Sequence, residues 1–181
     1  MLARGITDGP DRDIDSLHWA FLAAVTAARR TIRIMTPYFL PDRVLMKSIH
    51  LAAQRGVEID IVVPEVGNLP VVRAAMWGNF AQVLGKGVRL WLSPPPFDHS
   101  KIVVVDGYWS SVGSANWDPR SLRLNFEFNL ECYDEALGAA LEEHLLRRLK
   151  DARLLTHEEL DARSWIRKLR DGTARLFKPY L

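Results

Sequence analysis

Two short runs in which apolar residues predominate, 57–63 and Ile102–Val105, constrain the fold of this chain most. Strands with apolar side chains on both sides have both faces covered, so these runs predict a sheet with helices packed on it. Helical and strand-like apolar spacings alternate through the first half of the chain, at 16–30, 31–36, 42–54, 57–63, 69–84 and 88–92. Further strand patterns cluster later, before a long helical pattern from residue 135 to about 155. This order predicts the α/β class, as a three-layer α/β/α sandwich with a mixed sheet.

The gross composition narrows the class of protein further. A length of 181 residues suits one domain, and 48% hydrophobic residues can fill its core. The formal net charge of +2 gives no electrostatic footprint of a nucleic-acid-binding protein. A single cysteine, Cys132, cannot form an internal disulfide and is expected to be a buried thiol. The sequence contains no run of about 18 apolar residues, so it predicts no transmembrane helix.

The polar residues around the second apolar run follow the pattern H-x-K-x4-D-x6-G-S-x-N. Alternation along a strand places His99 and Lys101 on one face, and Ser114 and Asn116 share a face of the next strand. An imidazole titrates near neutral pH and can act as nucleophile or acid. An ammonium, a hydroxyl and an amide can hold an anion. The pattern therefore predicts phosphodiester chemistry, with these four side chains in catalytic roles.

The segment 125–130 alternates polar and apolar residues and predicts a third strand beside the other two. Its apolar residues are expected in the core; these are Phe126, Phe128 and Leu130. Its polar residues are expected on the motif face; these are Asn125, Glu127 and Asn129. Glu127 is expected to pair with His99, fixing its tautomer and raising its basicity. Asn125 is expected to contact substrate.

Three further candidates have competing interpretations. Asp106 belongs to the motif, but its position in the alternation is opposite to that of His99 and Gly107 follows it. A turn, with Arg120 as partner, therefore competes with a catalytic role. Tyr38 and Phe39 follow the first predicted strand, and they either line a substrate channel or anchor their loop through apolar packing.

At these residues the chain resembles the phospholipase D superfamily, whose HKD motif has this spacing. It is most similar to the C-terminal half of bacterial cardiolipin synthases, in the segments Asp8–Asp11, Thr36–Asp42, Arg55–Val57, Asp118–Ser121 and Leu124–Glu127. The resemblance implies a phospholipase D-like fold and a phosphohistidine intermediate. Two HKD histidines then act together, one as nucleophile and one as acid, and no metal or cofactor is required. Whether His99 is the nucleophile or the acid stays open.

The resemblance further implies a phosphatidyltransferase that acts on phosphatidylglycerol and passes the phosphatidyl group to an alcohol. If water accepts the group, the enzyme is a phospholipase D. Two alternatives remain: a single-HKD homodimeric endonuclease, and a non-catalytic scaffold half. The low net charge argues against the first, and the complete set of motif residues against the second.

The chain begins where the second half of such an enzyme would begin, so a truncated or split gene product, or an excised domain, is expected. The second motif would then come from an N-terminal half, a separate chain or a second copy of this one.

We expect an HKD domain at 1–156 and a basic amphipathic tail at 157–181. From Arg163 onward, six basic residues oppose only Asp171 and alternate with apolar ones; these are Arg163, Arg167, Lys168, Arg170, Arg175 and Lys178, with Trp165, Ile166, Leu169, Leu176, Phe177 and Tyr180. Such a tail predicts peripheral contact with an anionic membrane surface. Packing of the same helix back onto its own domain is the alternative.

Overall fold

The structure is a computed structural model that describes residues 1–11, 13–85 and 87–178. Its centre is an eight-stranded mixed sheet in the order β1-β7-β6-β5-β2-β3-β4-β8. The strands are β1 (Leu2–Asp8), β2 (Thr31–Met35), β3 (Glu58–Pro64), β4 (Val88–Ser93), β5 (Ile102–Val105), β6 (Trp109–Gly113), β7 (Glu127–Tyr133) and β8 (Arg153–Leu154). The pairs β2–β3 and β3–β4 are parallel, and all other neighbours are antiparallel.

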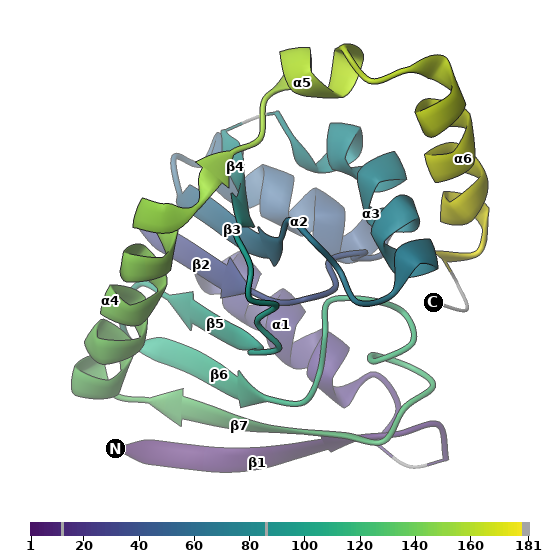
Figure 1. Cartoon of the computed structure of the whole chain (residues 1–181). Helices are drawn as coiled ribbons and strands as arrows, with labels where there is room; N and C mark the ends of the chain where they lie inside the picture. The colour runs from purple at the N-terminus through teal and green to yellow at the C-terminus, as the bar shows by residue number, and fades with distance from the viewer. Residues whose placement is uncertain (12, 86, 179–181) are drawn as a thin grey trace.

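Helices cover both faces of this sheet (Figure 1). They are α1 (Ser16–Ala27), α2 (Arg43–Gln54), α3 (Pro70–Val83), α4 (Glu135–Asp151), α5 (His157–Asp161) and α6 (Trp165–Leu176). The larger core lies on the side of α1, α2 and α3, whereas a smaller cluster, which includes Val104 and Leu145, lies under α4. The expected three-layer α/β/α sandwich with a mixed sheet is confirmed, and Cys132 is buried as expected.

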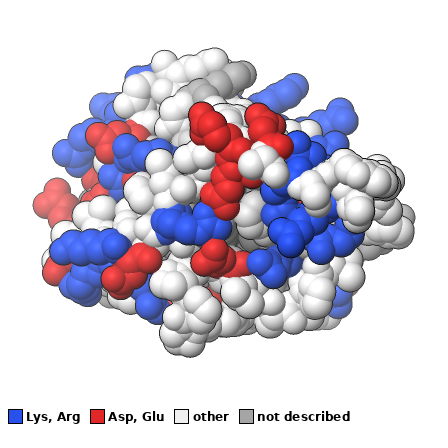
Figure 2. All heavy atoms as spheres, turned by 45° about the horizontal axis from the view of Figure 1, so that its top comes forward, with Lys and Arg blue, Asp and Glu red and all other residues white. Residues whose placement is uncertain are grey.

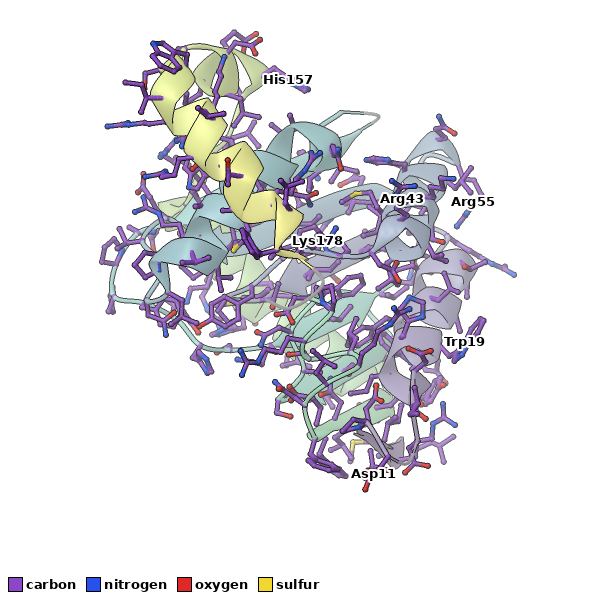
Figure 3. All side chains as sticks on the ribbon, turned by 90° about the vertical axis from the view of Figure 1, so that its right-hand side faces the viewer. Asp11, Trp19, Arg43, Arg55, His157 and Lys178 are labelled. Carbon is purple, nitrogen blue, oxygen red and sulfur yellow. The ribbon has the colours of Figure 1, made fainter. Side chains whose placement is uncertain are left out.

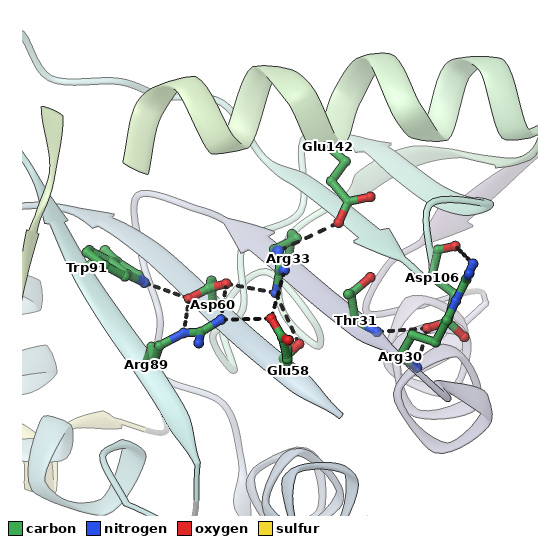
Figure 4. A network of polar contacts seen from close by, with 9 residues as sticks. All are labelled: Arg30, Thr31, Arg33, Glu58, Asp60, Arg89, Trp91, Asp106 and Glu142. Atoms are coloured by element: carbon green, nitrogen blue, oxygen red, sulfur yellow. Dashed lines mark hydrogen bonds and ion pairs between the residues drawn. The ribbon is translucent and has the colours of Figure 1, made fainter. Parts of the chain in front are cut away.

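A buried polar network fixes the central strands under α4 (Figure 4). Asp60 of β3 accepts hydrogen bonds from Arg89 Nε at 2.6 Å and from Trp91 Nε1 at 2.7 Å, and pairs with Arg33 Nη1 at 2.7 Å. Burial alone would raise the pKa of Asp60, but these partners hold it below its ordinary value. Glu142 of α4 faces Arg33 at 3.7 Å, so the network ties α4 to the sheet.

The expected orientation of β7 is wrong. Phe128 and Leu130 are 54% and 42% exposed, whereas Glu127 and Asn129 are buried on the side of α1. Asn129 is held there because its Oδ1 accepts from Ala115 N at 3.1 Å and its Nδ2 donates to Ser111 Oγ at 2.9 Å. On the side of α4, the helix leaves part of the sheet surface uncovered. We call this exposed apolar surface the open strip; its residues are Val112, Phe126, Phe128 and Leu130.

The tail packs back on the domain through α6. A Cβ atom on Gly78 of α3 would lie 2.4 Å from the carbonyl oxygen of Asp171, so the two helices are in close contact. Arg175 Nη1 donates to Gly78 O at 3.3 Å, and Lys178 donates to the carbonyl of Pro41. The boundary predicted after residue 156 stays a prediction, and Tyr180 lies outside the described residues. Among the described residues, no helix is long and apolar enough to span a bilayer.

Candidate active site

The motif residues other than Asp106 lie at one end of the central strands, where β2 ends and β5 begins. These two strands are antiparallel, so the segment that follows Met35 lies beside the segment that precedes Ile102. The chain after β6 and the start of β7 reach the same end, because Gly113 pairs with Asn129. Four segments distant in sequence therefore supply the polar side chains of the site.

His99 and Lys101 form the centre of this cluster. Lys101 is only 7% exposed, while the imidazole above it is exposed. Lys101 Nζ donates to His99 O at 2.7 Å and lies 3.1 Å from His99 Nδ1. The rings of Tyr38 and Phe97 have their centroids 6.3 and 5.8 Å from that of His99. The imidazole is therefore held between two aromatic rings and a buried cation, and solvent still reaches it.

The electrostatics of this pair favour a neutral imidazole. Burial and the adjacent charge of Lys101 lower the pKa of His99 from its ordinary value, against a smaller opposing effect of Asp98. Burial also lowers the pKa of Lys101, and the charges of Glu127, Asp118 and Asp98 partly oppose this. An unprotonated imidazole can attack phosphorus, and a poorly solvated ammonium interacts strongly with an anion.

Asn116 is the second predicted anion-holding residue that the structure places in the cluster. Its Oδ1 accepts from Thr36 Oγ1 at 3.4 Å, and its Nδ2 donates to Ser121 Oγ at 3.1 Å. Ser121 N in turn donates to Asp118 Oδ1 at 2.8 Å. This chain of contacts fixes the amide of Asn116 from both sides, as an anion-binding group requires.

Asp118 is a further candidate residue of this cluster, which the sequence reasoning did not select. Its carboxyl is 3% exposed, and burial raises its pKa to about 6, with a further contribution from the charge of Glu127. Its negative charge also acts on Lys101. A raised carboxyl pKa beside a catalytic cluster is typical of functional sites. The signal in the sequence was its place in the segment 118–121, which matched the family resemblance.

Glu127 lies in the cluster, but its expected contact with His99 is absent from the described hydrogen bonds. Its Oε1 instead accepts from Asn125 Nδ2 at 3.2 Å, and its charge acts on Lys101. The acidic residue whose charge reaches His99 is Asp98. Glu127 therefore balances the buried ammonium within this chain.

Ser114 reaches the same end of the strands but is tied to β7. Its Oγ accepts from Phe128 N at 3.0 Å, and its own backbone N donates to Phe128 O at the same distance. These two bonds extend the β6–β7 pairing beyond Gly113 and lead the chain toward Asn116. The described contacts of Ser114 are thus structural.

Asp106 lies at the other end of β5 from His99, outside the cluster. Its backbone is left-handed, with φ of 56°, and its carboxylate accepts from the backbone N of Arg29, Arg30 and Thr31 at 2.9, 2.7 and 2.9 Å (Figure 4). Burial would raise the pKa of Asp106, but these backbone donors lower it. The turn interpretation fits these contacts, and the partner is Arg30 where Arg120 was expected.

Tyr38 and Phe39 have different surroundings. Tyr38 is half-buried beside His99, and its hydroxyl donates to Asn68 Oδ1 at 2.7 Å. Phe39 is completely buried and stacks on Trp117 with ring centroids 5.8 Å apart. Phe39 therefore anchors the loop, and of the two only Tyr38 remains a candidate for contact with substrate.

Comparisons with known proteins agree with this arrangement. The family model described as "Cardiolipin synthase, PLD-like domain" matches residues 21–149. Cardiolipin synthase 2 of Staphylococcus epidermidis is 37% identical over 97% of this chain, and a cardiolipin synthase of Staphylococcus aureus is 35% identical over 97%. This chain spans only 36% and 35% of those two relatives, about a third of their length.

Two solved structures share the fold. A phospholipase D family member, Nuc from Salmonella typhimurium, has a TM-score of 0.70 at 24% identity, with 85% of this chain and 99% of that chain covered. Phosphatidylserine synthase from Haemophilus influenzae has a TM-score of 0.75 at 19% identity, with 99% and 47% covered. With the fold, the clustered HKD residues and the family model in agreement, this chain belongs to the family of cardiolipin synthase phospholipase D-like domains.

Proposed function

We propose that this chain is one half of a phosphatidyltransferase that acts on phosphatidylglycerol through a phosphohistidine intermediate. The observation that carries the proposal is the exposed imidazole of His99, which lies directly on the buried side chain of Lys101. The curated relatives at 35% and 37% identity, both named cardiolipin synthases, support the lipid substrate. The low net charge of +2 weighs against the alternative of an endonuclease.

The reaction has two displacements at one phosphorus. In the first, an unprotonated imidazole nitrogen bonds to phosphorus while the bond from phosphorus to the headgroup oxygen breaks, and an acid protonates the departing alcohol. In the second, the hydroxyl of an acceptor lipid bonds to phosphorus, its proton passes to the base, and the bond from phosphorus to nitrogen breaks. Lys101 and Asn116 stabilise the charge on the non-bridging oxygens in both steps. Water in place of the alcohol gives hydrolysis.

A second HKD half is part of the proposal, because each displacement needs an imidazole that bonds to phosphorus and a separate group that carries the proton. The open strip supports it: Phe126 is 74% exposed beside Val112, Phe128 and Leu130. Adjoining apolar side chains left exposed on a sheet mark an interaction surface. The second half, whether another copy, a separate chain or an N-terminal segment, covers this strip. The opposite face of β7, which carries Glu127, is the less exposed side of this strand.

The test is transfer of labelled phosphatidyl groups between phosphatidylglycerol molecules in mixed micelles, with the products separated by chromatography. We expect cardiolipin to form, with and without EDTA, once the second half is present. His99→Gln should reduce turnover to background while the melting temperature is kept. Wild-type turnover by the variant, or loss on chelation that a divalent ion restores, would contradict the proposal. Cleavage of duplex DNA in place of lipid transfer would favour the endonuclease.

A further inference from the structure

Helix α6 turns its apolar side away from the protein. Five large apolar residues on or just after it are between 56% and 75% exposed: Trp165, Ile166, Leu169, Leu176 and Phe177. The opposite side, which packs on α3, is polar and includes Asp171, which is 2% exposed, and Arg175. A helix that only completes the core would have the reverse orientation. Figure 3 shows α6 lying across the surface in front of α3.

A pocket lined by arginines lies beside this apolar side. Its volume is about 260 Å³, and its lining includes Arg73 and Trp77 of α3 with Arg163, Arg167 and Arg170. Arg163 stacks on the ring of Trp77, with its Cζ 3.9 Å from the ring centroid. Figure 2 shows basic side chains gathered over this part of the molecule, next to a white, uncharged area.

The positive charge of this pocket is only partly balanced. Asp171 accepts from both Arg163 and Arg170, the latter through Nε at 2.9 Å and Nη2 at 2.6 Å. Within the described ranges, no acid pairs with Arg73 or Arg167, and the buried Nε of Arg73 has no hydrogen-bond partner. Four guanidinium groups thus face one carboxylate. Guanidinium groups bind phosphate oxygens in a planar, two-pronged geometry, so the pocket suits a phosphate group.

The pocket is also near the active site. Tyr38, whose ring lies beside His99, lines a small neighbouring pocket together with Arg73 and Trp77. The same two residues of α3 line the arginine pocket. The arginine pocket and the surroundings of His99 are therefore linked through Arg73, Trp77 and Tyr38.

We propose that the arginine pocket binds the phosphate-bearing headgroup of an anionic phospholipid in a bilayer, while the outward side of α6 inserts among the headgroups. Apolar residues flanked by unbalanced cations are complementary to an anionic bilayer, which offers both a negative surface and an apolar interior. A nucleic acid would use the guanidinium groups but not the five exposed apolar residues. This inference rests on the proposed function only for the identity of the membrane lipid. Vesicle binding is measured without turnover, so a failure of this inference can be distinguished from a failure of the proposed function.

The experiment is co-sedimentation of the full chain with vesicles of phosphatidylcholine, alone or mixed with phosphatidylglycerol. The charge variant is Arg73→Gln/Arg167→Gln, and its control is Arg29→Gln/Lys150→Gln, which removes two exposed cations elsewhere. Each cation near the surface is worth about fivefold in partitioning, so the loss of two should weaken binding to mixed vesicles about 25-fold. The control should bind as the wild type does.

The apolar contribution is tested with Leu169→Gln/Leu176→Gln against Leu51→Gln/Leu154→Gln, which changes two exposed leucines elsewhere. The α6 variant should lose at least about tenfold in vesicle binding. A measurement on the wild-type protein does not depend on the folding of these variants. Brominated phosphatidylglycerol should quench part of the tryptophan fluorescence of the wild type, and this part should be absent from Trp165→Phe. Equal binding by either variant and its control, absent quenching, or tighter binding to duplex DNA through the arginines alone would overturn the proposal.

Discussion

At the scale of single residues, the site depends on a cation that solvent hardly reaches. Lys101 is 7% exposed and lies 3.1 Å from Nδ1 of His99, so its charge opposes protonation of the imidazole. We expect NMR titration to give His99 a pKa below its ordinary value of about 6.5. In Lys101→Met the pKa should rise, because the opposing charge is gone, whereas Lys101→Arg should keep it low. An unchanged pKa in Lys101→Met would show that burial alone sets it.

The same substitution tests the role of Lys101 in catalysis. Removal of one oriented charge from a developing anion typically costs ~3 kcal/mol, so Lys101→Met should lower kcat about 100-fold. The measurement is lipid transfer in the presence of the second half, with thermal unfolding as the check on folding. Lys47→Met, on the exposed side of α2, is the matched control and should keep wild-type turnover. A small effect on kcat with a large one on KM would instead assign Lys101 to substrate binding.

Asp118 gives a prediction about stability. Its folded-state pKa of about 6 lies above the unfolded value of about 3.9, so the folded state binds the proton more tightly between these values. Stability therefore falls as pH rises from about 4 to 7, by at most roughly 3 kcal/mol from this group. Asp118→Asn keeps an acceptor for Ser121 N and should lose this part of the pH dependence. Urea unfolding at several pH values measures the free energy of unfolding of both proteins. The same pH dependence in the wild type and in Asp118→Asn would contradict the prediction.

The sequence predicted which residues lie together better than it predicted their contacts. His99, Lys101 and Asn116 lie in one cluster because strand alternation and the antiparallel register bring them there. The partner of Glu127 was not predictable, since it depends on the side-chain positions of Asn125 and Lys101. Asp118 lies in a segment that carries the family resemblance, but the residue itself was not selected. Its burial sets it apart from an ordinary loop carboxylate, and burial is a property of the folded chain.

At the scale of secondary-structure elements, β7 shows where pattern reasoning ends. Alternation correctly grouped Phe126, Phe128 and Leu130 on one side, but it does not say which side of a sheet is covered. That depends on how far α4 extends over the strands, which is a tertiary property. Strand β1 was not predicted either, because only Ile6 and Asp8 of its residues are buried. It is an edge strand held by pairing with β7.

The open strip gives a prediction at this scale. Phe128→Asp places a carboxylate in the centre of the exposed apolar surface, and burying it against a second half would be costly. We expect the variant to fold, since this side chain is 54% exposed, but to lose association with the second half. Sedimentation velocity measures the association. Leu51→Asp, which changes an exposed leucine on α2, is the control and should associate normally; equal association by Phe128→Asp would place the interface elsewhere.

At the scale of the whole molecule, the reaction determines the assembly. Displacement at phosphorus places the attacking and departing atoms on opposite sides, and this chain supplies one HKD histidine, His99. One imidazole that bonds to phosphorus cannot also protonate the oxygen that leaves from the far side. The proposed mechanism therefore requires a second half that faces His99. If that half is another copy of this chain, a self-complementary patch gives a twofold dimer.

The resulting prediction links turnover to association. In a homodimer, specific activity should rise with concentration over the range in which sedimentation shows dimers, because two copies complete one site. Mixing with an excess of His99→Gln should then lower activity below the fraction of wild-type chain, since mixed dimers contain only one imidazole. If the second half is another polypeptide, the chain alone should be inactive at every concentration and gain activity only when that half is added. A strictly monomeric chain with full turnover would refute the shared site, because a single copy would then supply both the nucleophile and the proton-carrying group.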